Sequence, residues 1–358
     1  MAPFLSGGGY GSESWSYILS LHIYSMNKGS IFKLKIQQHG DLENLEFWEG
    51  LPFEMRNFAI ELYQTECKLN ETVVVCHSEP CSYYGYFRGV VGRTMFESDR
   101  INDEHVKRCN LLDFVWVPTD FHVKNFTQSG VDPLKIVKIV QPVDLDFFDP
   151  GKYEPPELDS IGNLVMGLSL NLETKFVFLS IFKWEYKGWD VIDVVLYLLT
   201  NPYRTDRDFG NKIVEYVESS DLEEPKDGWS RVYVIDEHIA QIDMPRLYKA
   251  ANAFVLPSRG EGWGRPIVEA MAMTLPMIAT NWSGPTEYMT EDNSYPLPGH
   301  LWAEPSVNKL QMLMRHVMRN QEDAKSRGKQ ARDDTMRRFS PEVVAGIVSD
   351  QIKRIIDH

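Results

Sequence analysis

Short apolar runs alternate with segments of helical spacing along most of the chain. The runs are rich in β-branched and aromatic residues and are bounded by polar positions; they span residues 72–76, 114–117, 176–181, 232–235, 254–256 and 276–279. Runs of this kind are typical of strands buried on both faces, as in parallel sheets. Because helical segments separate the runs, the pattern predicts repeated βα units and an α/β fold.

A break between two such regions lies at Asp149-Pro150-Gly151. A strand-like run at 138–140 precedes it, and a turn-prone acidic stretch follows as far as Asn163. A Pro/Gly pair between periodic regions is a good linker signal. With 358 residues and about 100–200 residues per domain, we expect two lobes, 1–149 and 151–335. The polar segment 201–229 is predicted to be an insertion with one helix.

The chain ends with a predicted helix over residues 340–358. Ser340 is a favourable N-cap, and Pro341 suits the first helical position. One apolar stripe then follows at helical spacing, formed by Val344, Ile347, Val348, Ile352 and Ile355. Such a stripe must pack against another part of the molecule.

Charge and cysteine usage narrow the classes of function. The formal net charge is −14, whereas a nucleic-acid-binding protein needs a basic footprint, so no nucleic-acid partner is expected. No run of about 18 apolar residues predicts a transmembrane helix, and the first residues do not resemble a signal peptide. The four cysteines form no zinc or disulfide pattern, so we expect free thiols and a cytoplasmic location.

The stretch from Leu256 to Ala272 carries the clearest chemical signal. A buried strand is followed by a loop with Gly260, Gly262 and Gly264, and Pro266 then opens a helix. Ligands bind at the carboxyl ends of strands in open α/β sheets, and glycines allow close backbone approach. A carboxylate accepts hydrogen bonds from neighbouring sugar hydroxyls. Glu261 and Glu269 therefore suit two sugar rings, although an exposed Glu261 and a helix-stabilising Glu269 are the structural alternatives.

Glu261 and Glu269 have seven residues between them, with Gly262-Trp263-Gly264 following the first. Together with the segments 270–272, 276–280 and 284–287, they resemble the E-x7-E signature of retaining family-4 glycosyltransferases. The resemblance implies the GT-B fold: two Rossmann-like, doubly wound lobes facing a cleft, with the terminal helix crossing back to the first lobe. It also implies that Glu261, Gly262, Trp263 and Gly264 contact a donor hexose, and that Glu269 binds the ribose. The amides near Ser283 and Gly284 then lie close to the donor.

Two further segments contain residues that are suited to bind a diphosphate. Lys183 and Lys187 follow the run at 176–181, where ammonium groups neutralise charge on a leaving group; a solvated loop is the alternative. The family resemblance supports the first reading, with Lys183 in place of a common arginine. Gly9 and Gly11 lie in a glycine-rich loop before a helical pattern. The strand expected before that loop has room only in residues 1–5, so it is very short or the chain is truncated.

The catalytic residue is marked less clearly. Many members of the family carry a histidine at the end of a strand in the first lobe, whereas the aligned stretch 92–99 has Phe96 and Glu97. His77 ends a buried strand and is a candidate, with a structural histidine as the alternative. Glu97 is an acceptor-side candidate or a capping residue. Asp144 and Asp146 have the spacing of some metal sites, but a structural role at the hinge is expected.

By this resemblance, the chain transfers a hexose with retention from UDP-glucose or GDP-mannose to an unknown carbohydrate, lipid or protein acceptor. No metal and no cofactor are expected, since the sugar nucleotide is a substrate. The alternatives are an isomerase or phosphorylase with the same fold, or a catalytically silent sugar-nucleotide-binding protein. Tyr83, Tyr84 and Tyr86 are candidates for stacking on an acceptor, or form an ordinary aromatic loop.

Overall fold

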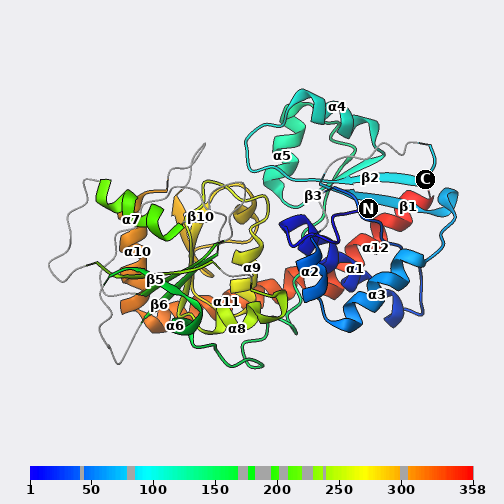
Figure 1. Ribbon diagram of the computed structural model, residues 1–358. Helices are drawn as coiled ribbons and strands as arrows, with labels where there is room; N and C mark the ends of the chain where they lie inside the picture. Colours follow the sequence, from blue (N-terminus) through cyan, green and yellow to red (C-terminus); the bar gives the residue numbers. More distant parts are fainter. Residues whose placement is uncertain are drawn as a thin grey trace.

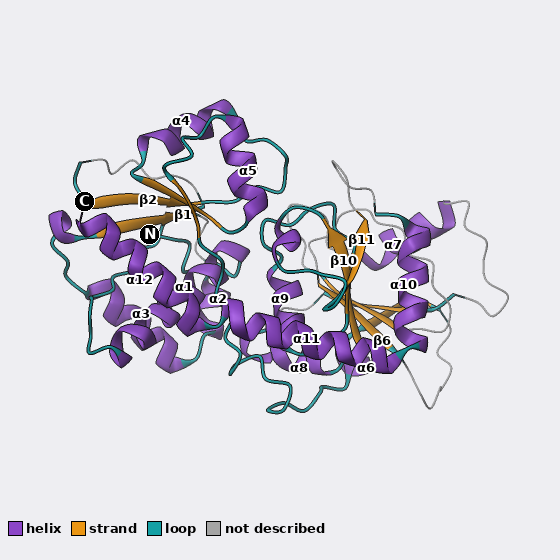
Figure 2. Ribbon diagram, turned by 180° about the vertical axis from the view of Figure 1, so that it is seen from behind, coloured by secondary structure: helices purple, strands orange, loops and turns teal. Residues whose placement is uncertain are grey.

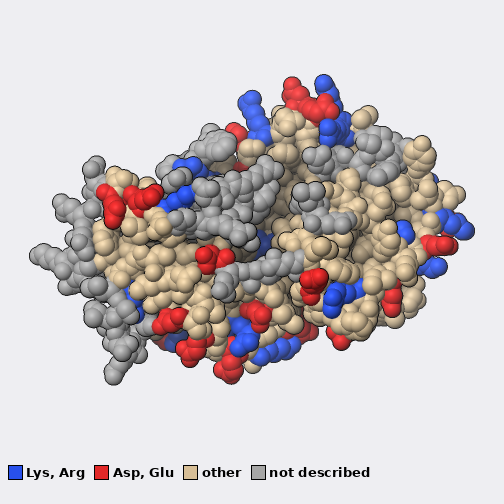
Figure 3. Space-filling view, in the orientation of Figure 1, with Lys and Arg blue, Asp and Glu red and all other residues tan. Residues whose placement is uncertain are grey.

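The computed structural model describes residues 1–40, 44–78, 85–167, 176–181, 195–200, 209–219, 229–236, 239–298 and 305–357. The chain forms two lobes side by side, each built on its own sheet (Figure 1). Among the described helices, none is long and apolar enough to cross a membrane. On the face shown in Figure 3, acidic and basic side chains are interspersed, with no broad basic patch.

The N-terminal lobe has a four-stranded parallel sheet with the order β1-β2-β3-β4. Its strands are β1 (Val73–His77), β2 (Gly89–Arg93), β3 (Phe114–Val117) and β4 (Ile136–Lys138). β2 is buried throughout, and β3 carries three buried residues in a row, as the unalternating runs predict. β4 ends at Lys138, two residues earlier than the strand expected through Val140.

Helices cover both faces of this sheet (Figures 1 and 2). One face carries α4 (Asp103–Leu111) and α5 (Asp120–Ser129); the other carries α1 (Gly9–Asn27), α3 (Phe53–Gln64) and α12 (Pro341–Asp357), with α2 (Leu45–Gly50) beside α1. A short 3-10 turn, η1 (Leu69–Glu71), leads into β1. The side chains of Asn102 and Thr119 cap α4 and α5 by accepting from His105 and His122 N–H.

The first residues of the chain extend this sheet without forming a regular strand. His77 N–H donates to Met1 O at 2.9 Å, so the N-terminal segment lies beside β1. On its other side, Ala2 forms a parallel bridge with Gln38. The segment around Gln38 therefore lies on the outer side of the N-terminal segment, toward the edge of the sheet, and β1 lies on its inner side. This reversal of winding is a topological switch point, where ligands bind in doubly wound sheets.

The C-terminal lobe has a seven-stranded sheet with the order β11-β10-β9-β6-β7-β8-β5. Its strands are β5 (Asn163–Met166), β6 (Val177–Ile181), β7 (Val195–Leu199), β8 (Arg231–Ile235), β9 (Ala253–Leu256), β10 (Met277–Asn281) and β11 (Tyr295–Pro298). Only β5, at one edge, is antiparallel to its neighbour among these strands. The winding reverses between β6 and β9, which places a second switch point there.

The C-terminal sheet also has helices on both faces (Figure 2). The helices of this lobe are α6 (Leu158–Ile161), α7 (Phe209–Ser219), α8 (Met244–Lys249), α9 (Arg265–Ala272), α10 (Val307–Arg319) and α11 (Gln321–Phe339), with the short turns η2 (Gln241–Asp243) and η3 (Gly284–Glu287). α9 lies on the side toward the N-terminal lobe, and α7 and α10 lie on the outer side. The structure confirms the expected α/β class with doubly wound parallel sheets.

The chain crosses between the lobes twice. The first crossing follows β4, and the second joins α11 to α12; they meet where Val143 N–H donates to Phe339 O at 2.8 Å. Arg332 of α11 donates to Phe148 O at 2.7 Å and also to Ala272 O at the end of α9. Asp144 Oδ1 accepts from Asp146 N–H and Phe147 N–H, so this aspartate caps a turn at the crossing.

The terminal helix α12 packs on the N-terminal lobe against α1 and the sheet. Four of the five expected stripe residues are buried or partly buried, but Ile347 is 39% exposed. Ala345, outside that stripe, is buried instead, so the buried face is rotated from the one predicted. Cys67 and Cys109 are free, whereas Cys76 is disulfide-bonded, so the expectation of free thiols was wrong for Cys76.

Candidate functional site

The loop after β9 is joined to the loop after β10 by a set of short hydrogen bonds. Ser283 Oγ accepts from Glu261 N–H at 2.9 Å and donates to Glu261 O at 2.8 Å. Gly284 N–H donates to the same carbonyl at 2.9 Å. A Cβ atom at Gly284 would lie 2.5 Å from Gly262 O, so this close approach of two backbones requires glycine. The pairing fixes the backbone of Glu261 at the switch point beside β6.

Trp263 and Gly264 link this loop to α9. Trp263 is buried, and its ring packs edge-on against Tyr288 and Phe339. Tyr288 donates to Trp263 O at 2.6 Å. Gly264 has φ +83° and is the N-cap of α9, a left-handed conformation that favours glycine. The helix begins at Arg265, so Pro266 occupies its second position, one later than expected.

Glu269 lies on the buried face of α9. Tyr248 of α8 donates to Glu269 Oε2 at 2.9 Å, and Arg265 Nη2 lies 3.6 Å from Glu269 Oε1. Burial raises the pKa of Glu269, and the Arg265 charge and the Tyr248 hydrogen bond oppose that effect. These two partners fix the position of the carboxylate, and its role in ligand binding stays a prediction.

The N-terminal lobe meets the glycine loop through the segment after β2. A Cβ atom on Gly262 would lie 2.8 Å from Met95 Sδ and 3.4 Å from Glu97 Oε1. A Cβ atom on Gly260 would lie 3.2 Å from Glu97 Cβ. The structure therefore brings two candidates from opposite lobes together, Glu97 and the loop that carries Glu261. A side chain on either glycine would require Met95 or Glu97 to shift.

A buried ionic cluster lies behind this meeting point, at the ends of β1 and β2. Arg93 donates through Nε and Nη2 to Glu13 Oε1 at 2.9 and 2.7 Å, and through Nη1 to Ile139 O at 2.7 Å. His77 Nδ1 lies 3.4 Å from Glu13 Oε2. Arg93 and Glu13 are fully buried, and His77 is nearly so. The cluster joins α1 to three strand ends.

The charges in this cluster shift one another's pKa values. Burial alone raises the pKa of Glu13, but Arg93 and His77 outweigh burial and lower it to about 2. Burial lowers the pKa of His77, and Glu13 only partly opposes this. His77 is thus a neutral ring held by a carboxylate on its Nδ1 side at neutral pH.

The glycine-rich loop opens α1. Gly9 is the first residue of the helix, and a Cβ atom there would meet nothing within 4 Å. Gly11 is buried, and a Cβ atom there would lie 2.1 Å from Ser6 O. Gly9 thus has open space beside it, whereas Gly11 has a packing role. Glu13 lies in the second turn of the same helix, so the helix also positions the ionic cluster.

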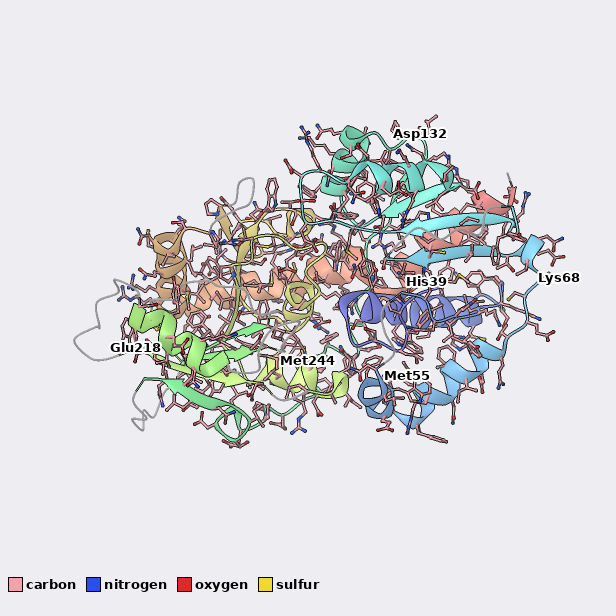
Figure 4. The ribbon with its side chains drawn as sticks, turned by 45° about the horizontal axis from the view of Figure 1, so that its top comes forward. His39, Met55, Lys68, Asp132, Glu218 and Met244 are labelled. Atoms are coloured by element: carbon pink, nitrogen blue, oxygen red, sulfur yellow. The ribbon has the colours of Figure 1, made fainter. Side chains whose placement is uncertain are left out.

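A second contact between the lobes is formed at Glu287, whose side chain is 4% exposed. Lys138 Nζ of β4 lies 3.1 Å, and Arg338 Nη2 of α11 lies 2.7 Å, from Glu287 Oε1. The N–H of Asp120, at the start of α5, donates to Glu287 Oε2 at 3.1 Å. Phe121 and Trp282 pack edge-on beside this group at 5.3 Å. Figure 4 shows the two lobes with the top of the molecule turned forward. In this view Met55 of α3 and Met244 of α8 lie where the two lobes approach each other.

Some candidates lie outside the described residues. These are Lys183, Lys187, Tyr83 and Tyr84. Lys183 and Lys187 follow β6, the strand next to β9 at the switch point, in the sequence. Tyr86 is described and is 68% exposed.

Four residues of the site were not expected from the sequence: Glu13, Arg93, Tyr248 and Arg265. Glu13 and Arg93 are 80 residues apart, and nothing local marks them as a pair. Arg93 lies in the stretch 92–99, which aligns with the strand end where many family members carry a histidine. That alignment was the one sequence signal that could have pointed to Arg93. Tyr248 has no distinguishing pattern around it.

Comparison with protein families gives a match to the model described as "Glycosyl transferases group 1" over residues 234–334. This range contains the glycine loop, α9 and Glu287. A curated relative, the O-antigen chain mannosyltransferase B of Escherichia coli, is 34% identical over 100 residues. That match covers 27% of this chain and 23% of the relative, so the chain matches about a quarter of the relative's length.

Solved structures of similar fold cover much more of the chain. A sucrose-phosphate synthase from Thermosynechococcus elongatus gives a TM-score of 0.64 at 15% identity, covering 95% of this chain and 93% of that one. A glycosyltransferase from Rickettsia africae gives 0.61 at 14% identity, covering 97% and 96%. HepE from Anabaena, in complex with UDP and glucose, gives 0.57 at 16% identity, covering 74% and 72%. At these identities the likeness establishes the shared GT-B fold.

Proposed function

We propose that the chain transfers a hexose from a nucleotide diphosphate sugar to an acceptor hydroxyl, with retention of anomeric configuration. The match of residues 234–334 to the group 1 glycosyltransferase model and the GT-B fold of the two lobes support this proposal. The observation that carries the proposal is the arrangement of the two glutamates. Glu261 lies on a glycine loop that meets the opposite lobe, and Glu269 is a buried carboxylate on the following helix.

In this proposal the C-terminal lobe holds the donor. Glu261 and the amides of residues 262–264 contact the hexose, with Ser283 and Gly284 close to the donor, and Glu269 accepts hydrogen bonds from the ribose hydroxyls. Lys183 and Lys187 neutralise the diphosphate as it leaves. UDP-glucose and GDP-mannose are the proposed donors. The UDP-glucose complex of HepE supports the first donor, and the name of the mannosyltransferase relative supports the second.

The reaction breaks the bond between the anomeric carbon and the β-phosphate oxygen and forms a bond to the acceptor oxygen on the same face. The acceptor proton passes to the departing diphosphate. His77 and Glu97 are the proposed acceptor-side residues, with the neutral His77 ring oriented by Glu13. Lobe closure over the donor excludes water and limits hydrolysis.

Donor binding is tested first, with UDP-glucose, GDP-mannose and their free nucleotides. A ligand that binds only the folded chain raises the melting temperature by mass action, and calorimetric titration then gives the dissociation constant. We expect Glu269→Ala to weaken binding of the preferred nucleotide about tenfold or more, because ribose hydroxyls lose a charged acceptor. Glu322→Ala, at an exposed position of α11, is the matched control. Unchanged affinity in Glu269→Ala would refute the ribose assignment.

Stereochemistry and metal dependence need separate measurements. The anomeric coupling in the NMR spectrum of the product distinguishes retention from inversion. Turnover with EDTA is expected to equal turnover with added Mg²⁺ or Mn²⁺, because lysines and helix N-termini supply the positive charge in this proposal. Release of free hexose without an acceptor distinguishes slow hydrolysis from a silent binding protein.

A further inference from the structure

Arg265 is the first residue of α9 and reaches from the C-terminal lobe to the N-terminal lobe. Its Nη2 donates to Ser16 Oγ of α1 at 3.0 Å. Its Nη1 lies 3.5 Å from Gln141 Oε1, at the first crossing between the lobes. The side chain is only 14% exposed. A guanidinium with its donors in a rigid fork is suited to hold several acceptors at once.

The same guanidinium holds the carboxylate of Glu269, one turn further along α9. Nη2 lies 3.6 Å from Glu269 Oε1, while Tyr248 donates to Oε2 at 2.9 Å. An ionised carboxylate has about four acceptor positions, so both oxygens retain capacity for two hydroxyl donors. Arg265 Nε is buried and has no hydrogen-bond partner among the described residues, which leaves one donor for a ligand or an ordered water.

Glu269 must be ionised to accept from two hydroxyls, and its surroundings oppose ionisation. Burial raises its pKa, and Arg265 is the cation that counteracts the effect. The other titratable group that faces it among the described residues is Tyr248 of α8; from α1, Tyr17 faces Arg265. Loss of the Arg265 charge therefore favours protonation of Glu269 and removes an acceptor.

We propose that Arg265 is a positioning residue that holds Glu269 for a nucleoside ribose and links that carboxylate to α1 of the opposite lobe. Through Ser16, the orientation of Arg265 depends on the contact between α9 and α1, and the arrangement of the lobes with this contact is here called closed. The ribose site is thus complete only when the lobes are closed, and nucleotide binding favours closure in return. This inference rests on the proposed function, since it needs a nucleotide at Glu269.

The test measures dissociation constants for UDP and GDP by titration calorimetry from pH 5.5 to 8, in the wild type, four single variants and the double variant of Ser16 and Arg265. Arg265→Met is expected to weaken binding of the preferred nucleotide about tenfold at neutral pH, with a larger loss at the acid end because Glu269 protonates earlier. Arg265→Lys keeps the charge but not the fork, so it recovers the pH profile and only part of the affinity. Arg246→Met, an exposed arginine on α8, is the control and is expected to bind like the wild type.

Ser16→Ala tests the link between the lobes. It is expected to weaken nucleotide binding a few-fold alone and to add nothing to Arg265→Met, because both changes break one connection. Full additivity of the two losses would overturn the link. Nucleotide binding by Arg265→Met and Arg265→Lys at the wild-type affinity and pH profile would overturn the role of Arg265 and leave the proposed function standing. If the wild type binds neither UDP nor GDP, both proposals fail together.

Discussion

At the scale of single residues, the most consequential contact is the buried pair of Glu13 and Arg93. Removing one partner of a buried pair leaves an uncompensated charge, which costs about 3–5 kcal/mol. We therefore expect Glu13→Gln to lower the free energy of unfolding by about that amount, measured by urea unfolding. Glu71→Gln, which breaks an exposed pair with Lys68, is the matched control and is expected to leave the midpoint unchanged. Equal midpoints in the two variants would contradict the structural role of Glu13.

A second residue-scale effect concerns the buried ring of His122. Burial lowers its pKa from 6.5 to about 3. Above pH 6.5 the ring is neutral in folded and unfolded chains, so it does not affect the pH dependence. As the pH falls below 6.5, the unfolded chain binds a proton that the folded chain excludes, and the free energy of unfolding decreases.

His122→Asn is therefore expected to reduce the slope of the free energy of unfolding against pH. Between about pH 6.5 and 5 the reduction is close to the slope that one bound proton gives. His77 and the Met1 amino group, whose pKa values burial also lowers, contribute to the slope that remains. The cost of the substitution itself is measured at about pH 8, where the protonation of His122 plays no part. An unchanged slope in urea unfolding across this range would show that the ring is not kept neutral.

At the scale of the element, α12 provides a matched pair of positions. Ile355 is 5% exposed and packs on Gly89 of β2, whereas Ile347 on the same helix is 39% exposed. Truncation of a buried isoleucine to alanine costs about 2–5 kcal/mol, so Ile355→Ala is expected to lower the unfolding midpoint clearly. Ile347→Ala is expected to change it little. Similar losses in both would mean that α12 buries a different face.

The strands and loops also show how much of the fold and of the site the sequence predicts. Unalternating apolar runs located six strands, because burial on both faces leaves a local pattern. Edge strand β5, with two exposed residues, has no such pattern. The loop at 260–264 was identifiable because its glycines and glutamates are close in sequence. The Glu13–Arg93 pair was not, because only the folded sheet brings α1 to the end of β2.

At the scale of the whole molecule, each lobe has one switch point. In the N-terminal lobe, the reversal lies beside β1, where His77 ends the strand and α1 begins. In the C-terminal lobe, it lies between β6 and β9, where the glycine loop begins. Ligands bind at such points in doubly wound sheets, so a ligand between them contacts both lobes. The ion pairs at Glu287 then bear on how readily the lobes separate.

Glu287 joins the lobes because its carboxylate is shared by Lys138 of the N-terminal lobe, Arg338 of α11 and the N–H of Asp120. Glu287→Gln keeps the shape but removes the charge, so the attraction to Lys138 is lost. We expect this variant to have a larger radius of gyration than the wild type in small-angle X-ray scattering without ligand.

Added salt should enlarge the wild type toward the variant, because screening weakens partly exposed pairs such as the one at Lys138. Asp292→Asn, an exposed acid after η3, is the control for the loss of one charge and is expected to scatter like the wild type. If Glu287→Gln scatters like Asp292→Asn at every salt concentration, the packing of Phe121 on Trp282 and the contacts of the glycine loop hold the lobes together instead. The ion pairs then only fix the register of α5 against η3.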